Sequence, residues 1–271
     1  MAHDVVLVDI ADRVAVITIN RPDQRNALNQ AVRRALPDAI TGCDADDGVD
    51  VMILTGADPA FSAGVDLKEF GSGPVTQGES FGGVAETRDA FRGALPPHTK
   101  PLIGAVNGVA VTGGFEVALN CDFLIASERA RFADTHARVG AMPGAGLIVR
   151  LPQLIGVDRA RRMSFTGDFI DAATALAWGL VAEVVPHERL LERAREIAAG
   201  VASIPRDNIR EIRRMYETIG ALSGEAAWQA ESDWSRRWMQ ERFDQSRLAT
   251  ERETIMARGR SQSSGLDNAP A

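Results

Sequence analysis

Short, strongly apolar runs recur along the first half of the chain, between more polar segments. Two of them, VVLVDI at 5–10 and RVAVITIN at 13–20, are separated by a tight polar connection, which predicts an antiparallel pair of strands. Three more, DVMILTG at 50–56, KPLIGAVNG at 100–108 and DFLIAS at 122–127, alternate with segments of helical pattern. Continuously apolar strands that alternate with helices imply a buried, largely parallel sheet with crossover connections. The pattern therefore predicts an α/β protein.

A helical pattern follows the first two strands, over residues 21–40. Asn26 and Asn29 are both possible N-caps, because an asparagine side chain can accept a hydrogen bond from a backbone N–H of the first turn. Pro37 interrupts the pattern. A proline inside a helix removes one hydrogen bond, so we expect a kink or an early end there.

The character of the sequence changes at about residue 187, after which charged residues dominate on a helical pattern. An amphipathic helix with large aromatic side chains near the end of a chain usually docks on another surface, here the core of the same subunit or a neighbour. The aromatic residues that recur on this polar background are Trp228, Trp234, Trp238 and Phe243.

Composition and charge narrow the class of protein. The chain has 271 residues, of which 45% are hydrophobic, enough for a sizeable core. A net charge of -7, from 30 basic and 37 acidic residues, argues against a nucleic-acid partner but leaves room for an anionic small molecule. No apolar run approaches the roughly 20 residues that span a bilayer, and the first residues lack a signal-peptide pattern. We therefore expect a cytoplasmic protein with no membrane partner.

Cysteine and histidine usage indicates neither disulfides nor a metal site. Cys43 and Cys121 form no close-spaced motif, which suits two thiols in a reducing compartment. The histidines are scattered and show no metal-ligand spacing. They are His3, His98, His136 and His187.

The stretch GVAVTGGFEVALNCD at 108–122 places two glycines directly before a helical run. Gly113 and Gly114 would let the backbone approach a ligand and present N–H groups that a helix start leaves unpaired. Such donors can stabilise an oxygen that becomes anionic during a reaction. Glu116, about one turn from Gly113, could face the same ligand. The alternative is close helix–sheet packing, with Glu116 as a solvated surface charge.

PAFSAGVDLKEF at 59–70 follows the same logic, with a tight turn at 62–64 and a helix that begins near Asp66. Its small residues expose backbone N–H groups around Val65, and two such loops at neighbouring strand ends could aim two donors at one oxygen. The alternative is an ordinary strand-to-helix connection. The segment 71–86, rich in Gly, Ser and Pro, is either a lid beside the site or a plain surface loop.

Several of these segments together resemble the enoyl-CoA hydratase/isomerase (crotonase) family. AFSAGVDLKEF, KPLIGAVNGVAVTGGFEVALNCDFLIAS, MPGAG and AWGLVAEVVP occur in the family's order. The resemblance implies a crotonase-like spiral of ββα units and a helical C-terminal region that builds a trimer or a dimer of trimers. It divides the chain into a core with the acyl-CoA site at 1–190, a helical oligomerisation region at 191–260 and a disordered tail at 261–271.

The resemblance also implies the substrate and the residues that hold it. Family members bind acyl-CoA thioesters, so coenzyme A is part of the substrate and no separate cofactor is expected. They polarise the thioester carbonyl with two backbone N–H groups, which match those of Val65 and Gly113. The residues matched to substrate binding are Arg25, Ala63, Asp66, Leu67 and Lys68.

The chain departs from the family pattern at one catalytic position. The family's hydratases use two glutamates, of which the first matches Glu116. An ungapped alignment of RFADTHARVGAMPGAG puts His136 at the second, with Asp134 and Thr135 displaced by one or two positions. An imidazole can accept a hydrogen bond from water and act as a general base near neutral pH, so His136 could partly replace the carboxylate. Alternatively, His136 only shapes the pocket, or makes a structural hydrogen bond.

The leading hypothesis is therefore an enoyl-CoA hydratase of fatty-acid metabolism, with Glu116 and His136 as catalytic residues. A double-bond isomerase needs only one proton-moving group and is the second hypothesis; an acyl-CoA-binding protein without catalysis is the third. A dinucleotide-binding oxidoreductase is discounted, because GAG at 144–146 lacks the third glycine of that fingerprint and Val149 stands there.

Overall fold

The computed structural model divides the chain into two compact units, 1–213 and 214–271. Within the described residues, no helix combines the length and the apolar character that crossing a membrane requires. The structure describes residues 4–66, 69, 93–243, 246, 250–254 and 256–258.

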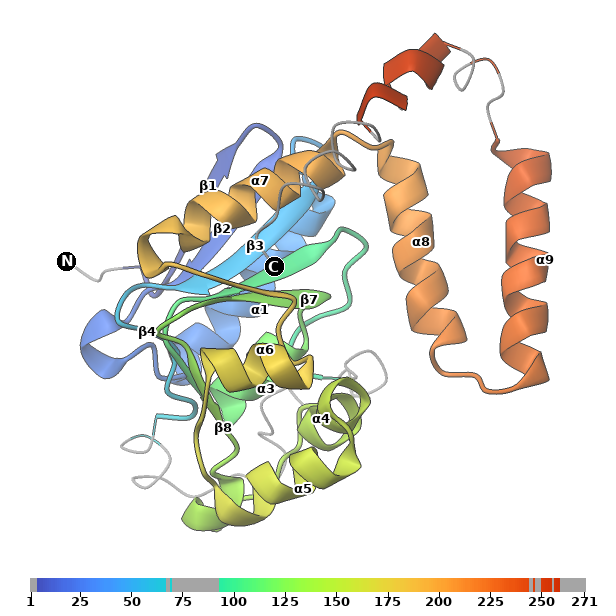
Figure 1. Ribbon diagram of the computed structural model, residues 1–271. Helices are drawn as coiled ribbons and strands as arrows, with labels where there is room; N and C mark the ends of the chain where they lie inside the picture. The colour runs from blue at the N-terminus through green and yellow to red at the C-terminus, as the bar shows by residue number, and fades with distance from the viewer. Residues whose placement is uncertain are drawn as a thin grey trace. The chain divides into compact units, whose positions relative to one another are not determined.

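The first unit is built on a six-stranded sheet with the strand order β1-β2-β3-β5-β7-β10 (Figure 1). β1 and β2 pair antiparallel, and the other neighbouring strands pair parallel. The predicted antiparallel pair and the three predicted apolar strands are confirmed. The strands are β1 Val6–Ala11, β2 Val14–Ile19, β3 Val51–Gly56, β5 Leu102–Val106, β7 Phe123–Ser127 and β10 Glu183–Val185.

A second, smaller sheet has the order β4-β6-β8-β9. Along the chain, β3 leads into β4, β5 into β6 and then α3, and β7 into β8 and then a 3-10 turn, η2. This repeat is the spiral of ββα units that the family resemblance implied, and it sets the ends of β4, β6 and β8 side by side. The small strands are β4 Ala60–Ser62, β6 Val109–Val111, β8 Arg131–Ala133 and β9 Ile170–Asp171.

The large sheet is apolar on both faces because helices cover both. On β3, Val51 and Ile53 join the apolar cluster of α7, whereas Met52 and Leu54 join the larger cluster that includes α1. Successive side chains of a strand point to opposite faces, so a continuous apolar run serves two layers. The covering helices, seen in Figure 1, are α7 Leu190–Ala202 and α1 Gln30–Ala45.

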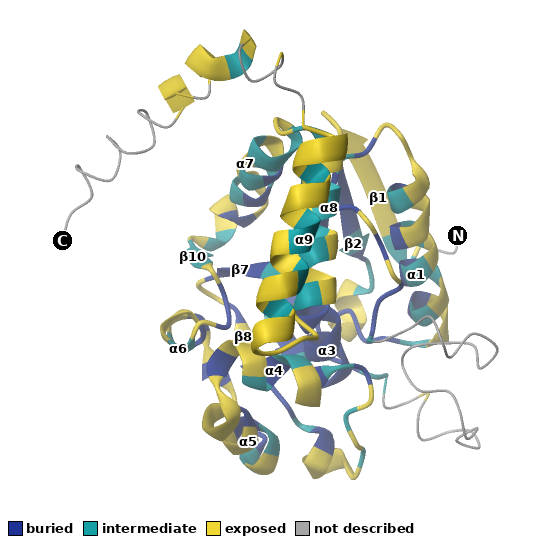
Figure 2. Ribbon diagram, turned by 90° about the vertical axis from the view of Figure 1, so that its right-hand side faces the viewer, coloured by how far each residue is buried: buried dark blue, intermediate teal, exposed yellow. Residues whose placement is uncertain are grey.

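Of the remaining helices of the first unit, α3 and α6 contact the small sheet, and α4 contacts α3 and α5. α3 is buried along its whole length (Figure 2), so its sequence of small and apolar residues serves packing on all sides. The α-helices are α3 Gly113–Leu119, α4 Leu147–Ile155, α5 Val157–Thr166 and α6 Ala172–Trp178; the 3-10 turns are η1 Pro22–Gln24, η2 His136–Val139 and η3 His187–Arg189.

α1 does not end early at Pro37, one of the two outcomes predicted there, and it begins at Gln30 instead of residue 21. The helix starts at the predicted cap, since the Asn29 side chain accepts a hydrogen bond from Val32 N–H at 3.0 Å. It then continues through Pro37 to Ala45. Apolar side chains buried at helical spacing on both sides of the proline outweigh the one hydrogen bond that proline removes.

The helical segment after residue 202 contains α8 Arg206–Ile219 and α9 Glu225–Glu241. Neither helix contains a buried residue within the described part of the chain. The Arg214 guanidinium lies 4.6 Å from the centre of the Trp234 ring, a cation–π contact that joins the two helices. Of the four aromatic residues that the sequence indicates for docking, Trp228 and Phe243 are exposed, whereas Trp234 and Trp238 are partly buried.

Candidate active site

The loops after β4 and β6 meet at the start of α3. Gly64 has a φ of +87°, and a Cβ added to it would lie 2.6 Å from the carbonyl oxygen of Val111 and 3.4 Å from Gly113 N. Only glycine allows so close an approach in this conformation. The loop that carries Val65 is therefore packed directly against the backbone of Gly113, and the structure brings the two predicted N–H donors into one region.

Gly114 explains the second glycine of the pair. A Cβ on Gly114 would lie 2.4 Å from the carbonyl oxygen of Ser62 and 2.7 Å from its Oγ. Real Cβ atoms do not come this close to a backbone oxygen, so a larger residue would force the two loops apart. Gly114 therefore lets α3 pack closely against β4, which is the helix–sheet packing that the alternative interpretation of this glycine expected.

Thr112, the residue before this glycine pair, has a strained backbone. Its φ of 53° and ψ of -115° are unusual for a β-branched residue, at a typical cost of about 1–3 kcal/mol. Two contacts hold it there: its N–H donates to the Ala133 carbonyl at 3.0 Å, and its hydroxyl lies 2.5 Å from that of Thr135. The neighbouring strand thus fixes the direction of the peptide that leads into Gly113.

Glu116 is a buried residue, only 2% exposed, so its interpretation as a solvated surface charge is wrong. Its Oε1 accepts hydrogen bonds from Ala145 N–H at 2.8 Å and Gly144 N–H at 3.1 Å. Asn120, one turn further along α3, donates to the Ala145 carbonyl at 2.9 Å and keeps that turn in place. One carboxylate oxygen is thereby fixed, and the other remains for chemistry.

The environment of Glu116 also changes its acidity. Burial raises the pKa of Glu116, and the N–H groups of Ala145 and Gly144 counteract that rise only in part. A carboxyl group whose pKa moves toward neutrality is better matched to both accepting and returning a proton.

His136 lies close to Oε2, the second carboxylate oxygen of Glu116. The imidazole is 5% exposed, and its Nε2 lies 3.7 Å from Oε2 of Glu116. Its Nδ1 lies 2.7 Å from Oδ1 of Asp134, which is 1% exposed. Burial favours a raised pKa for Asp134, but hydrogen bonds from His136 and Ser164 outweigh it and hold the pKa below its usual range. The three side chains form one chain of polar contacts.

The sequence did not indicate Asp134 as a site residue, because it is displaced from the position that matches the family's second glutamate. The residue stands two positions before His136, and only the turn into η2 folds its carboxylate back onto the ring. Asn120 had a usable signal, because residues four apart share one face of a helix and Asn120 is four residues after Glu116.

Of the predicted substrate-binding residues, the structure describes Arg25, Ala63 and Asp66. Arg25 is exposed, and its carbonyl accepts from Ala63 N–H at 2.9 Å. Asp66 forms an ion pair with Arg21 at 3.0 Å, a partner 45 positions away that no local pattern identifies. Three calls lie outside the described residues: Leu67, Lys68 and the segment 71–86.

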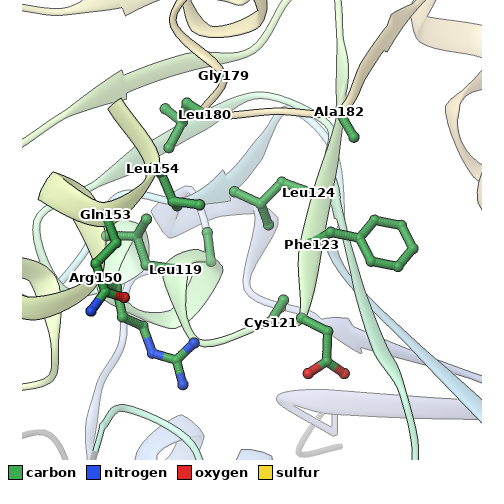
Figure 3. A pocket seen from close by; sticks show the side chains of 12 residues that line it. Leu119, Cys121, Phe123, Leu124, Arg150, Gln153, Leu154, Gly179, Leu180 and Ala182 are labelled. Carbon is green, nitrogen blue, oxygen red and sulfur yellow. The ribbon is translucent and has the colours of Figure 1, made fainter. Parts of the chain in front are cut away.

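A cavity of about 180 Å³ lies elsewhere, between α3, β7, α4 and the 179–182 segment (Figure 3). Its lining is mostly apolar, with polar groups from Asp122, Arg150 and Gln153, and includes neither Glu116 nor His136. The buried Cys121 thiol beside it has a raised pKa because burial disfavours the thiolate. Among the described residues, no group of His, Cys, Asp and Glu is arranged to hold a metal ion.

The sequence and the fold of this chain are both similar to those of known proteins of one family. Residues 9–254 match the family model described as enoyl-CoA hydratase/isomerase. A probable enoyl-CoA hydratase of Rhizobium meliloti is 39% identical over 206 residues, which cover 75% of this chain and 77% of the relative.

Solved structures agree with the sequence matches. An enoyl-CoA hydratase of Mycobacterium smegmatis is 48% identical with a TM-score of 0.71, covering 87% of this chain and 98% of that one. A Geobacillus kaustophilus protein titled as an enoyl-CoA hydratase subunit is 30% identical with a TM-score of 0.81, covering 92% and 95%.

Proposed function

Because this chain belongs to the enoyl-CoA hydratase/isomerase family, we propose that it is an enoyl-CoA hydratase, a lyase that adds water to 2-enoyl-CoA thioesters in acyl-CoA metabolism. The observation that carries the proposal is the buried pair of Glu116 and His136, with Nε2 and Oε2 3.7 Å apart. The pair lies on segments that follow β6 and β8, beside the loops that carry Val65 and Gly113.

The N–H groups of Val65 and Gly113 hold the thioester carbonyl in this proposal. When the water oxygen bonds to the β carbon, electrons of the double bond move toward the carbonyl oxygen, which becomes an enolate oxygen. Donors that already point at that oxygen stabilise the charge without reorganising, and loss of one such donor typically costs about 100- to 1,000-fold in rate. The packing of Gly64 and Gly114 keeps the two donors at a fixed separation.

Glu116 moves the protons. Its Oε1 is occupied by the N–H groups of Gly144 and Ala145, so Oε2 accepts the proton of the reacting water. As the water oxygen bonds to the β carbon, the π electrons move to the α carbon and the thioester. Oε2 then returns its proton to the α carbon, and the product is a 3-hydroxyacyl-CoA. His136 holds the second hydrogen of the same water.

The substrate's coenzyme A portion is assigned to the rim of the two loops. Arg25 and Lys68 supply positive charge for the phosphates, and the segment of Ala63, Asp66 and Leu67 supplies contacts to adenine and pantetheine. The exposed position of Arg25 and the pairing of its backbone with Ala63 support this assignment. No separate cofactor is required, because every step uses groups of this chain and of the substrate.

A homotrimer or dimer of trimers in the cytoplasm completes the proposal. Exposed apolar side chains on α8 and α9 favour assembly, including Tyr216, which is 79% exposed, and Trp228. The two cysteines are unpaired, as expected in a reducing compartment. Sedimentation equilibrium of the purified chain tests the assembly, and a monomer at micromolar concentration would contradict it.

A double-bond isomerase is the second candidate, favoured by the replacement of the second family glutamate by His136, since isomerisation needs one proton-moving group. Turnover of a chain-length series of 2-enoyl-CoA thioesters in ¹⁸O-labelled water separates the candidates. Hydration gives a labelled 3-hydroxyacyl product, isomerisation gives unlabelled product with a moved double bond, and binding without either product means a non-catalytic protein.

A further inference from the structure

The carboxylate of Asp134 is held in one orientation. Its Oδ1 accepts hydrogen bonds from the backbone N–H of His136 at 3.2 Å and from the ring Nδ1 at 2.7 Å. The Ser164 side chain, on α5, makes a further hydrogen bond to it. A buried carboxylate with this many donors cannot rotate freely, so it determines the orientation of the ring.

This contact fixes which ring nitrogen carries the proton. An ionised carboxylate only accepts hydrogen bonds, so Nδ1 of His136 must be the N–H donor. In the neutral imidazole the lone pair is then on Nε2, on the side of Glu116. Asp134 is ionised over a wide range, since its pKa is below the usual value for this residue type.

Two acceptors therefore face each other across a short gap. Nε2 of His136 and Oε2 of Glu116 are 3.7 Å apart, and neither brings a hydrogen to the other when Glu116 is ionised. One water about 2.8 Å from both atoms can donate one hydrogen to each. With the other tautomer, Nε2 would carry a hydrogen and could not accept one from the water.

We propose that Asp134 is a positioning residue that holds His136 as the Nδ1–H tautomer, so that Nε2 serves as the second acceptor for the reacting water. This inference rests on the proposed hydratase function. It explains how an imidazole can stand where the family's hydratases have a carboxylate: in this tautomer alone it presents an acceptor with no hydrogen. Asp134 itself touches neither water nor substrate.

A kinetic cycle tests the coupling between the two residues. Asp134→Asn keeps the shape but provides an amide that can donate as well as accept. We expect kcat for a short 2-enoyl-CoA to fall on the order of 100-fold with KM nearly unchanged. In a His136→Glu background, whose acceptor has no tautomers, Asp134→Asn should change kcat by no more than about twofold. Equal losses in both backgrounds would mean a purely structural role and overturn the proposal.

The tautomer can be measured directly, without turnover. With ¹⁵N-labelled histidine, long-range ¹H–¹⁵N correlation spectra distinguish protonated from unprotonated ring nitrogens, and His136→Gln identifies the signals that belong to this ring. We expect a protonated Nδ1 and an unprotonated Nε2 in the wild type, and a shift toward Nε2–H in Asp134→Asn.

A protonated Nε2 in the neutral ring of the wild-type protein refutes the inference, even if Asp134→Asn does not fold. If the tautomer is as expected but no 2-enoyl-CoA is hydrated, the proposed function fails while the positioning contact stands.

Discussion

Replacement of Glu116 by glutamine removes the proposed proton acceptor and is therefore the most direct test of the mechanism. The side-chain carbonyl of glutamine can keep the hydrogen bonds from Ala145 and Gly144, at 2.8 and 3.1 Å in the wild type. The amide then takes the place of Oε2, facing Nε2 of His136, and cannot accept a proton. The fold is retained and the proton acceptor is lost.

The size of the effect follows from the role of that oxygen. General acid–base catalysis contributes on the order of 100- to 10,000-fold, which corresponds to about 3–5 kcal/mol of barrier. We expect kcat for a short 2-enoyl-CoA to fall by that range, measured by the loss of enoyl-thioester absorbance. Glu128→Gln is the matched control, because Glu128 is exposed and outside the site.

Stability should change in the opposite direction. Burial raises the pKa of Glu116 above its ordinary value of 4.5, so folding favours the protonated form. The stability that this group contributes is complete below pH 4.5 and is lost as the pH rises through the raised folded pKa. Thermal unfolding should therefore show Tm of Glu116→Gln rising relative to the wild type above that pH. Full turnover by the variant, with this Tm gain present, would refute Glu116 as the proton acceptor.

Three further changes test other parts of the site and fold. His136→Ala should reduce kcat, but less than Glu116→Gln does, and an equal or larger loss in the same assay would contradict the order of roles. Gly114→Ala should lower both Tm and kcat, because its Cβ would meet the Ser62 carbonyl oxygen at 2.4 Å, whereas Gly144→Ala, with nothing within 4 Å, should leave Tm nearly unchanged. Burial and the nearby Arg213 lower the pKa of His98 from 6.5, so stability should decrease as the pH falls below 6.5, and denaturant titrations of His98→Gln should show a weaker decrease.

Five strands of the large sheet, all but β10, could be predicted from the sequence because they are long enough to show an apolar run. The small sheet could not, because β4, β6 and β8 have three residues each, too few for a period-two pattern to appear. The end of α1 could not be predicted from the sequence. The penalty of Pro37 is local, whereas the burial that offsets it comes from packing in the larger core cluster.

The sequence could indicate Gly113, Gly114 and Glu116 as candidates, because these residue types stand out in the motif that contains them. The pairing of Asp134 with His136 depends on the backbone turn into η2, which residue order alone does not define. The pairing of Arg21 with Asp66 likewise depends on tertiary structure, since 45 positions separate the two.

Two parts of the proposed site can change independently of each other. One is the main chain near Gly64 and Gly114, and the other is the set of side chains that move protons. In the proposed mechanism the thioester carbonyl is held by main-chain N–H groups, and Gly64 and Gly114 allow the close packing of the segments that carry them, so no side chain tunes that contact. The proton-moving groups are side chains on α3 and η2, which can be exchanged without disturbing that contact. A scaffold arranged in this way can keep its contact with the substrate carbonyl while one replacement, such as an imidazole with its own supporting carboxylate, changes the group that handles the reacting water.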